Sequence, residues 1–272
     1  MIENSIIDRQ IENTSEALAA LGVTASTLSE DEKTSLDTNG YVVLHDMIDS
    51  SWLTELRSTY ENLMNEKYGK WHPAMTGGKE SDFWFHEVGT RRLADLVSEG
   101  QAFDRIYTHP RLLAAISFIL PGGLRFHSLN ARDALPGQGH QHLHVDAQPL
   151  KPGEPFCLVN TAWLLDGFTA ENGPTRVVPG SHKIPGPLSA HVADAFAPHP
   201  REERVIAPAG SVLVFNAHVW HSGTTNNSSS PRRVIHCAFT RRDCPQHDCQ
   251  AQRIRKGVYE RISPAARFIL DV

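Results

Sequence analysis

The feature that most constrains this chain is a series of short β-type segments between Leu124 and Arg241. Six apolar, β-rich runs occur there, each bounded by Gly, Pro or Asn: LRFHSLNA, HQHLHVDAQ, FCLVNTAWLL, TRVVPG, SVLVFNAHVW and RRVIHCAFT. Short strands separated by turn signals are typical of a β-sandwich or an open barrel. We therefore expect a mainly β fold.

Helical patterns lie outside this β-rich region, and we expect helices at residues 8–21, 30–36, 50–69 and 110–120. Ser29 is expected to cap the second helix, and Ser50 or Ser51 the third. The third helix carries apolar residues at helical spacing, namely Leu53, Leu56, Tyr60 and Leu63. A strand is expected at residues 41–44, after the turn signal Asn39-Gly40. Helices thus flank the predicted sheet.

Three segments lack periodicity. Residues 67–87 are rich in Gly and aromatic side chains, so they either overhang a pocket as a long loop or fill a core edge. Residues 189–203 read as an insertion between strands, and residues 226–231 as a polar loop. We expect substrate contacts from residues 67–87 and 187–205.

Composition sets the class of protein and of partner. The 272 residues are 40% hydrophobic and include five Trp, which is enough for one core with helical additions. The net charge of −5 argues against the basic patch that nucleic acid or anionic lipid requires. We expect a single domain over residues 1–272 that binds a small molecule, with no nucleic-acid and no membrane partner. The sequence gives no oligomeric state.

The cysteines and the N-terminus bear on location. Four cysteines in this length do not form a disulfide scaffold, and Cys244 and Cys249 lack the paired CxxC spacing of a zinc site. Reduced thiols are therefore expected. The first residues carry no basic segment followed by an apolar run, and no 18-residue apolar stretch occurs. We expect a cytoplasmic protein.

Metal-ligand residues gather in HQHLHVD, residues 140–146. As a strand, this segment would place His140, His142, His144 and Asp146 on one face, because side chains alternate with period two. Buried polar groups need partners, and a metal would supply one. A His-x-Asp pair is common by chance, so it needs a third ligand from another strand. Two His and one carboxylate form the facial triad of non-haem iron(II).

The third ligand is expected after the apolar strand that follows Gly210, where the candidates are His218 and His221. Eleven residues after His221, Arg232 begins another strand, and its planar guanidinium suits a dicarboxylate. One of Arg232 and Arg233 is expected to be structural instead, because most arginines face solvent. The remaining histidines nearby, His127, His140, His142 and His236, are expected to hydrogen-bond rather than to ligate.

The segments ENGPTRVVPGSHK (171–183) and GSVLVFNAHVWHSGTTNNSSSPRRVIHCAF (210–239), which follow the His-x-Asp, resemble the signature of the phytanoyl-CoA dioxygenase family of iron(II)- and 2-oxoglutarate-dependent oxygenases. The N-terminal part of the match is NGYVVLHDMI, from Asn39. The resemblance divides the domain into an N-terminal helical extension (1–38), a family-like core (39–243) and a C-terminal tail (244–272).

The resemblance implies a mainly β fold with flanking helices, a double-stranded β-helix or jelly-roll, cupin-like barrel. It implies Fe(II) held by His144, Asp146 and His221, which is why we prefer His221 to His218. By the same resemblance, Arg232 is the arginine that binds the far carboxylate of 2-oxoglutarate, and Thr175 and Asn130 are further contacts of this cosubstrate. Because Asp146 is present where related halogenases have a small residue, we expect hydroxylation or another outcome of hydrogen abstraction.

The expected function is a dioxygenase that uses Fe(II), 2-oxoglutarate and O₂ to hydroxylate, desaturate or cyclise a small organic molecule, as in secondary-metabolite biosynthesis. Two alternatives stay open: a non-catalytic metal- or ligand-binding barrel protein, and a zinc hydrolase that uses the His and Asp ligands. The zinc hydrolase gives Arg232 no required role.

Overall fold

Two antiparallel sheets and flanking helices make up the chain in a computed structural model that describes residues 11–72, 89–246 and 249–272. The larger sheet has six strands in the order β1-β7-β4-β9-β3-β2, and the smaller has three in the order β6-β5-β8. The strands are β1 (Tyr41–Leu44), β2 (Thr90–Leu93), β3 (Leu124–Ala134), β4 (Leu158–Leu164), β5 (Thr175–Val177), β6 (Glu203–Arg204), β7 (Val212–Asn216), β8 (His221–Gly223) and β9 (Arg232–Arg241). The mainly β prediction is confirmed.

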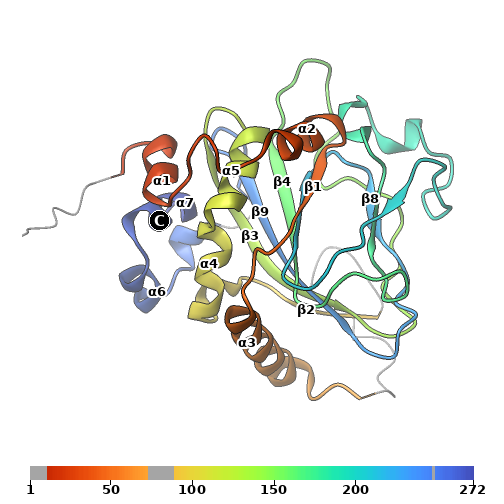
Figure 1. Ribbon diagram of the computed structural model, residues 1–272, viewed down its shortest axis with the longest axis horizontal. Helices are drawn as coiled ribbons and strands as arrows, with labels where there is room; N and C mark the ends of the chain where they lie inside the picture. Colours follow the sequence, from red (N-terminus) through yellow and green to blue (C-terminus); the bar gives the residue numbers. More distant parts are fainter. Residues whose placement is uncertain (1–10, 73–88, 247–248) are drawn as a thin grey trace, which may run out of the picture.

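The helices gather on one side of the six-stranded sheet, while β8 and the rest of the small sheet lie on the other (Figure 1). The α-helices are α1 (Thr14–Ala20), α2 (Glu30–Thr38), α3 (Ser50–Tyr68), α4 (Asp104–Thr108), α5 (Pro110–Ile119), α6 (Lys256–Arg261) and α7 (Pro264–Leu270). Among the described residues, no ladder between named strands joins the two sheets, so the jelly roll is open rather than closed into a barrel.

The six-stranded sheet separates two apolar clusters. The larger lies under the helices, runs from Ala17 to Leu270 and includes the edge-to-face pair Trp52 and Trp163, whose ring centroids lie 5.6 Å apart. The smaller lies between the sheets and includes Phe168 and Phe215. Alternate residues of one strand pack into different clusters, because successive side chains point to opposite faces of a sheet.

Helix boundaries follow local capping chemistry. Ser29 caps α2 as predicted, and Glu32 completes a capping box with it. For α3 the prediction of Ser50 or Ser51 was wrong: the Asp49 side chain accepts from the backbone N–H of Trp52 at 2.9 Å. A carboxylate at this position also interacts favourably with the positive end of the helix.

The buried stripe of α3 differs from the predicted one. Leu56 and Tyr60 are fully buried as expected, but Leu53 and Leu63 are only half-buried. Trp52 and Met64 complete the stripe instead, so that the four buried residues follow one another at a spacing of four. The indole N–H of Trp52 donates to the carbonyl of Ala102 at 2.8 Å, which fixes this end of the stripe inside the core.

The predicted strand over residues 140–146 was wrong. That segment makes one isolated bridge, between His144 and His221, with both backbone hydrogen bonds at 3.0 Å. On either side the backbone turns to other partners: Leu143 donates to the carbonyl of Ala195 and Asp146 to that of Ala217. Because the partner changes from residue to residue, a regular ladder cannot form.

The cysteine prediction was wrong for one pair. Cys157 and Cys244 form a disulfide that joins the start of β4 to the segment after β9, across a sequence separation of 87. Cys237 is free and buried, and Cys249 is free and exposed. The pair comes together because β4 and β9 are neighbours in the sheet.

The two long segments expected to contact substrate differ in what the structure describes. Most of residues 67–87 lies outside the described residues. Residues 187–205 contain a short 3₁₀ turn at Leu188–Ala190 and the strand β6. They are anchored by the buried Arg176, whose guanidinium donates to the carbonyls of Ala195 and Ala197 and to Glu202. Arg176 therefore pairs with a nearby carboxylate.

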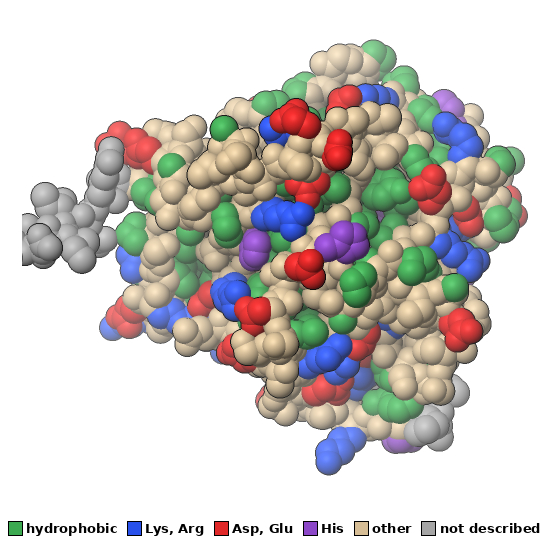
Figure 2. Space-filling model, in the orientation of Figure 1, with side chains coloured by type: hydrophobic (Ala, Val, Ile, Leu, Met, Phe, Trp, Pro, Cys, Tyr) green, Lys and Arg blue, Asp and Glu red, His purple; other side chains and the backbone are tan. Residues whose placement is uncertain are grey.

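Acidic and basic side chains are interspersed on the face of the molecule drawn in Figure 2. Among the described residues, no helix combines the length and the apolar character needed to cross a membrane.

Candidate metal centre

Three side chains with metal-ligand chemistry meet at one end of the open jelly roll. His144 and His221 are opposite each other in the isolated bridge, so their rings lie side by side with centroids 4.4 Å apart. Asp146 follows two residues later and points to the same side. One ligand atom from each of the three lies within 4.8 Å of the other two. Within the described residues, this is the one such group of His, Cys, Asp or Glu.

Backbone carbonyls orient both imidazoles. Nδ1 of His144 lies 2.8 Å from the carbonyl oxygen of His142, and Nδ1 of His221 lies 2.9 Å from that of Val219. A carbonyl can only accept, so each Nδ1 carries the hydrogen and each Nε2 keeps its lone pair. The two Nε2 atoms lie 3.7 and 3.4 Å from the oxygens of Asp146. Such orientation is typical of metal-ligating histidine.

The carboxylate is oriented as well. Nδ2 of Asn160, on β4, donates to Oδ2 of Asp146 at 2.9 Å. The side-chain oxygen Oδ1 of Asn160 in turn accepts from the backbone N–H of Thr161, so the side-chain amide is held in one orientation. The three side chains are partly shielded: the exposed fraction is 8% for His221 and 24% for His144 and Asp146.

Electrostatics keep the carboxylate ionised. Burial raises the pKa of Asp146. The adjacent His221, His144 and the Asn160 amide together lower it by more than burial raises it, so the net shift is downward. Burial lowers the pKa of His144 to about 4, and the neighbouring His221 lowers it too. For His221, burial is outweighed by Asp146, and its pKa rises.

The three residues line a cavity of about 1060 Å³. The cosubstrate contacts expected from the sequence line the same cavity: Arg232 at the start of β9, Thr175 on β5 and Asn130 on β3. Arg232 is only 2% exposed, and its guanidinium carbon lies 4.6 Å from the ring centroid of Phe168. The structure thus brings together all six residues singled out from the sequence.

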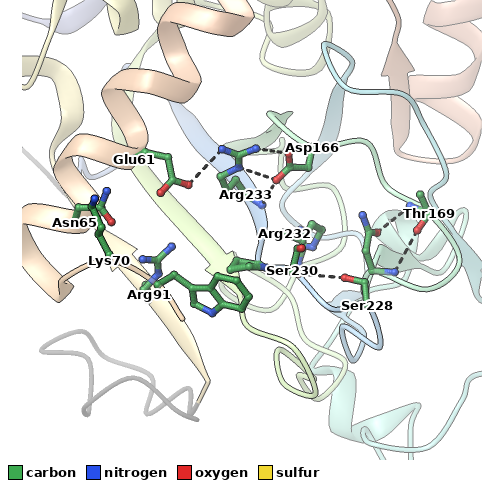
Figure 3. A pocket seen from close by; sticks show the side chains of 13 residues that line it. Glu61, Asn65, Lys70, Arg91, Asp166, Thr169, Ser228, Ser230, Arg232 and Arg233 are labelled. Atoms are coloured by element: carbon green, nitrogen blue, oxygen red, sulfur yellow. Dashed lines mark hydrogen bonds and ion pairs between the residues drawn. The ribbon is translucent and has the colours of Figure 1, made fainter. Parts of the chain in front are cut away.

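Arg233 has a different environment, as expected of one arginine of the pair. Both arginines line a second cavity of about 570 Å³, and there Arg233 points between Glu61 and Asp166 (Figure 3). Its guanidinium donates to both oxygens of Asp166, at 2.9 and 2.7 Å, and to Glu61 at 3.3 Å. Arg233 is structural.

The remaining histidines do not join the group of three. His218 lies near Asn216 Oδ1 at 3.1 Å and the carbonyl of Gln148 at 3.1 Å. His140 and His142 contact the ring of Phe196, with centroids 5.9 and 5.7 Å apart. His236 lies on the cavity wall, 3.2 Å from the carbonyl of Thr161.

Three residues of the site were missed from the sequence. Asn160 orients Asp146, while Arg92 and Arg132 add two cations to the cavity wall. Polar and apolar positions alternate in LRFHSLNARDA, residues 124–134. This alternation is a signal that Arg132 lies on the face opposite the core. Asn160 carried no comparable signal, because its role depends on where residues 144–146 cross β4.

Comparison with known proteins gives two kinds of match. The family model described as phytanoyl-CoA dioxygenase (PhyH) matches residues 36–234. The dioxygenase trt7 of Aspergillus terreus is 28% identical over 210 residues, covering 72% of this chain and 69% of the relative.

Solved structures match in fold. HygX from Streptomyces hygroscopicus, solved with nickel, 2-oxoglutarate and hygromycin B bound, has a TM-score of 0.63 at 18% identity over 80% of this chain and 90% of that chain. EctD from S. alaskensis with bound Fe has a TM-score of 0.60 at 20% identity over 79% of this chain and 77% of that chain. At these identities the likeness shows the fold alone, and it confirms the predicted jelly-roll class.

Proposed function

This chain belongs to the phytanoyl-CoA dioxygenase family, and from that premise we propose that it is an iron(II)- and 2-oxoglutarate-dependent dioxygenase that oxidises a small organic molecule. The observation that carries the proposal is the inward orientation of both Nε2 atoms and the Asp146 carboxylate within a cavity that also holds Arg232. HygX and EctD, which share the fold, were solved with 2-oxoglutarate or iron bound.

The donor set fits iron(II). His144, His221 and Asp146 would occupy one side of the ion and leave positions open on the cavity side, which is the arrangement of the 2-His-1-carboxylate triad. A structural zinc site would use four protein ligands, and the group found among the described residues has three. The bound ion, 2-oxoglutarate and O₂ supply the oxidising power, with 2-oxoglutarate leaving as succinate and CO₂.

The chain's own residues contribute binding and orientation. Arg232 would hold the far carboxylate of 2-oxoglutarate with two parallel N–H donors, and its position over Phe168 limits the orientations of that fork. Thr175 and Asn130 would add contacts from facing sheets. Asn160 holds Asp146 in place, so the carboxylate is oriented before the ion binds.

The finer reaction is also a proposal. Because Asp146 stands at the carboxylate position, hydroxylation of a C–H bond is the outcome we propose, with desaturation or cyclisation as results of a different substrate position. The relative trt7 carries the name of a dioxygenase. For this chain we propose that the molecule oxidised is a secondary metabolite.

The first experiment is the anaerobic addition of Fe(II), and then of 2-oxoglutarate, to metal-free protein. A weak visible charge-transfer band should appear when the 2-oxo acid chelates the ion. Arg232→Ala should lose the band at the same cosubstrate concentration. Arg233→Ala is the matched control, because it removes the neighbouring guanidinium from the other cavity and should keep the band.

No band from folded, iron-loaded wild-type protein would contradict the proposal and favour a non-catalytic metal-binding barrel. Hydrolytic activity with Zn(II) and no response to 2-oxoglutarate would favour the zinc hydrolase, in which Arg232 has no assigned role.

A further inference from the structure

Phe196 is an exposed aromatic side chain at the cavity of the metal centre. Among the described residues, four large hydrophobic side chains are exposed: Phe118, Phe196, Ile206 and Tyr259. Phe196 has the largest exposed fraction, 62%, and of these four it is the one that lines the cavity. An apolar side chain left in water forgoes the free energy of burial, and apolar rings are typical contacts of a ligand in a cavity. Phe196 is therefore a candidate contact for the molecule that enters.

The backbone on both sides of Phe196 is held in place. The guanidinium of the buried Arg176 donates to the carbonyl of Ala195 at 3.1 Å and to that of Ala197 at 3.0 Å. The carbonyl of Ala195 also accepts from the backbone N–H of Leu143 at 2.7 Å. An exposed ring on a fixed backbone loses little conformational freedom when a ligand covers it, which favours binding.

Two imidazoles flank the Phe196 ring. His140 stacks on it, with ring centroids 5.9 Å apart and an angle of 28° between the planes. His142 lies 5.7 Å from it at an angle of 58°. Both histidines line the same cavity. These three residues, His140, His142 and Phe196, form an aromatic wall, and ring faces of this kind pack against apolar and aromatic molecules.

The aromatic wall continues to the candidate metal ligands. The ring of His142 lies 5.5 Å from that of His144, which lies 4.4 Å from that of His221. The ring of Phe215 lies 4.6 Å from that of His221 and also lines the cavity. Phe196 is thus two ring contacts away from His144. One small molecule can therefore pack on Phe196 and still present a C–H bond to the metal.

Aliphatic side chains extend the apolar surface on this side of the cavity. A charged group packed against them would lose its hydration without gaining a partner, so the surface favours an apolar part of the substrate. The aliphatic residues that line the cavity and belong to one apolar cluster are Leu143, Val145, Leu188 and Ala195.

We propose that Phe196 determines substrate specificity at the metal centre, and that the substrate carries an apolar ring system whose face packs on the aromatic wall. This inference rests on the proposed function, since it names the substrate class of the same site. Phe196 positions the ring system, and the part of the substrate that lies nearest His144 is the part that is oxidised.

The test uses phenylnaphthylamine, an uncharged aromatic probe that fluoresces strongly in apolar surroundings. Full-length protein is loaded with Fe(II) and 2-oxoglutarate under anaerobic conditions. The probe is then titrated while its fluorescence and the visible charge-transfer band are recorded. We expect one saturable site in the wild type. The band should shift as the site fills, because a probe in this cavity displaces water beside the ion.

Three variants assign the binding to Phe196. Phe196→Ser should weaken the affinity for the probe at least about tenfold, because it removes a ring that the probe would cover. Phe196→Trp keeps an aromatic face and should restore the affinity. Phe118→Ser is the matched control, since it removes an exposed phenylalanine from α5, outside the cavity, and should bind the probe like the wild type. The band recorded before the probe is added should be the same in all three.

Three results would overturn the inference: no saturable binding of the probe by the wild type, an affinity of Phe196→Ser no lower than that of Phe118→Ser, or binding that leaves the band unchanged. The last would place the probe outside the cavity of the metal centre. Absence of the band from the wild type before the probe is added would instead be a failure of the proposed function. Fluorescence of Phe196→Ser and Phe118→Ser would still test the aromatic wall, so the two failures are distinguishable.

Discussion

The two faces of the six-stranded sheet are built from the same strands and do different work. On β9, Ile235, Cys237 and Phe239 lie in the cluster under the helices, whereas Arg232 and His236 line the cavity. On β4, Trp163 packs under the helices, while Asn160 holds the candidate metal ligand Asp146. Period-two alternation thus separates the residues that stabilise the fold from those that bind.

The boundary between the faces is seen most directly at Arg232 and Arg233. These neighbours have the same side chain, yet one lines the metal cavity and the other pairs with Asp166 and Glu61 on the side of α3. The comparison predicts that substitutions on the cavity face will change binding with little effect on folding, and that substitutions on the helix face will do the reverse.

The largest effect is expected from Asp146→Ala on the cavity face. Loss of the carboxylate removes one of three ligands, so Fe(II) binding and turnover should both be abolished, as measured by iron content after desalting and by succinate release. The melting temperature of the metal-free protein should change little, because Asp146 makes no contribution to either apolar cluster.

His218→Ala is the control for that experiment, since His218 lies between Asn216 and Gln148 and outside the group of three. It should retain iron. If Asp146→Ala retained iron and His218→Ala lost it, Asp146 would be removed from the proposed ligands and His218 would be added.

The next effect belongs to the helix face. Trp163→Ala should lower the free energy of unfolding by about 3–5 kcal/mol, because Trp163 is fully buried and the cavity left beside Trp52 cannot close fully. Urea unfolding measures this loss. The fraction that stays folded should bind Fe(II) as the wild type does, and a proportionate loss of iron affinity would show that the two faces are not independent.

A smaller effect is expected from Asn160→Ala, which removes the hydrogen bond to Asp146 but no ligand. Loss of such an orienting partner weakens metal binding by about 10–100-fold. Competition with a chelator measures the affinity. Asn65→Ala, a change of the same size on α3 in the second cavity, should leave it unchanged; equal weakening by both variants would remove Asn160 from the site.

The smallest effect concerns His109, whose ring lies 6.0 Å from that of Trp163 on the helix face. Burial, together with nearby Arg105 and Arg111, lowers its pKa to about 4 from the ordinary 6.5. The unfolded chain therefore takes up a proton first, and the free energy of unfolding should fall as the pH drops from 6.5 to about 4. His109→Gln should reduce this slope, as followed by urea midpoints across that range. An unchanged slope would assign the acid sensitivity to other groups.

The sequence by itself determined the elements with a local cause. The β-rich runs between Leu124 and Arg241 other than residues 140–146, the cap at Ser29 and the strand at residues 41–44 follow from side-chain periodicity and turn chemistry, which act between neighbours in the chain. It also supplied the chemistry of the candidate site, because imidazole, carboxylate and guanidinium at these spacings suit few tasks. The resemblance to the family then singled out His144, Asp146, His221 and Arg232 from the candidates.

Only the tertiary structure decided which of these residues meet. The crossing of residues 144–146 over β4 selected Asn160, the pairing of β2 with β3 set Arg92 opposite Arg132, and the neighbouring strands β4 and β9 brought Cys157 to Cys244. The physical reason is that hydrogen bonds, ion pairs and disulfides form between groups that are close in space, and their partners here lie tens of residues apart in the chain.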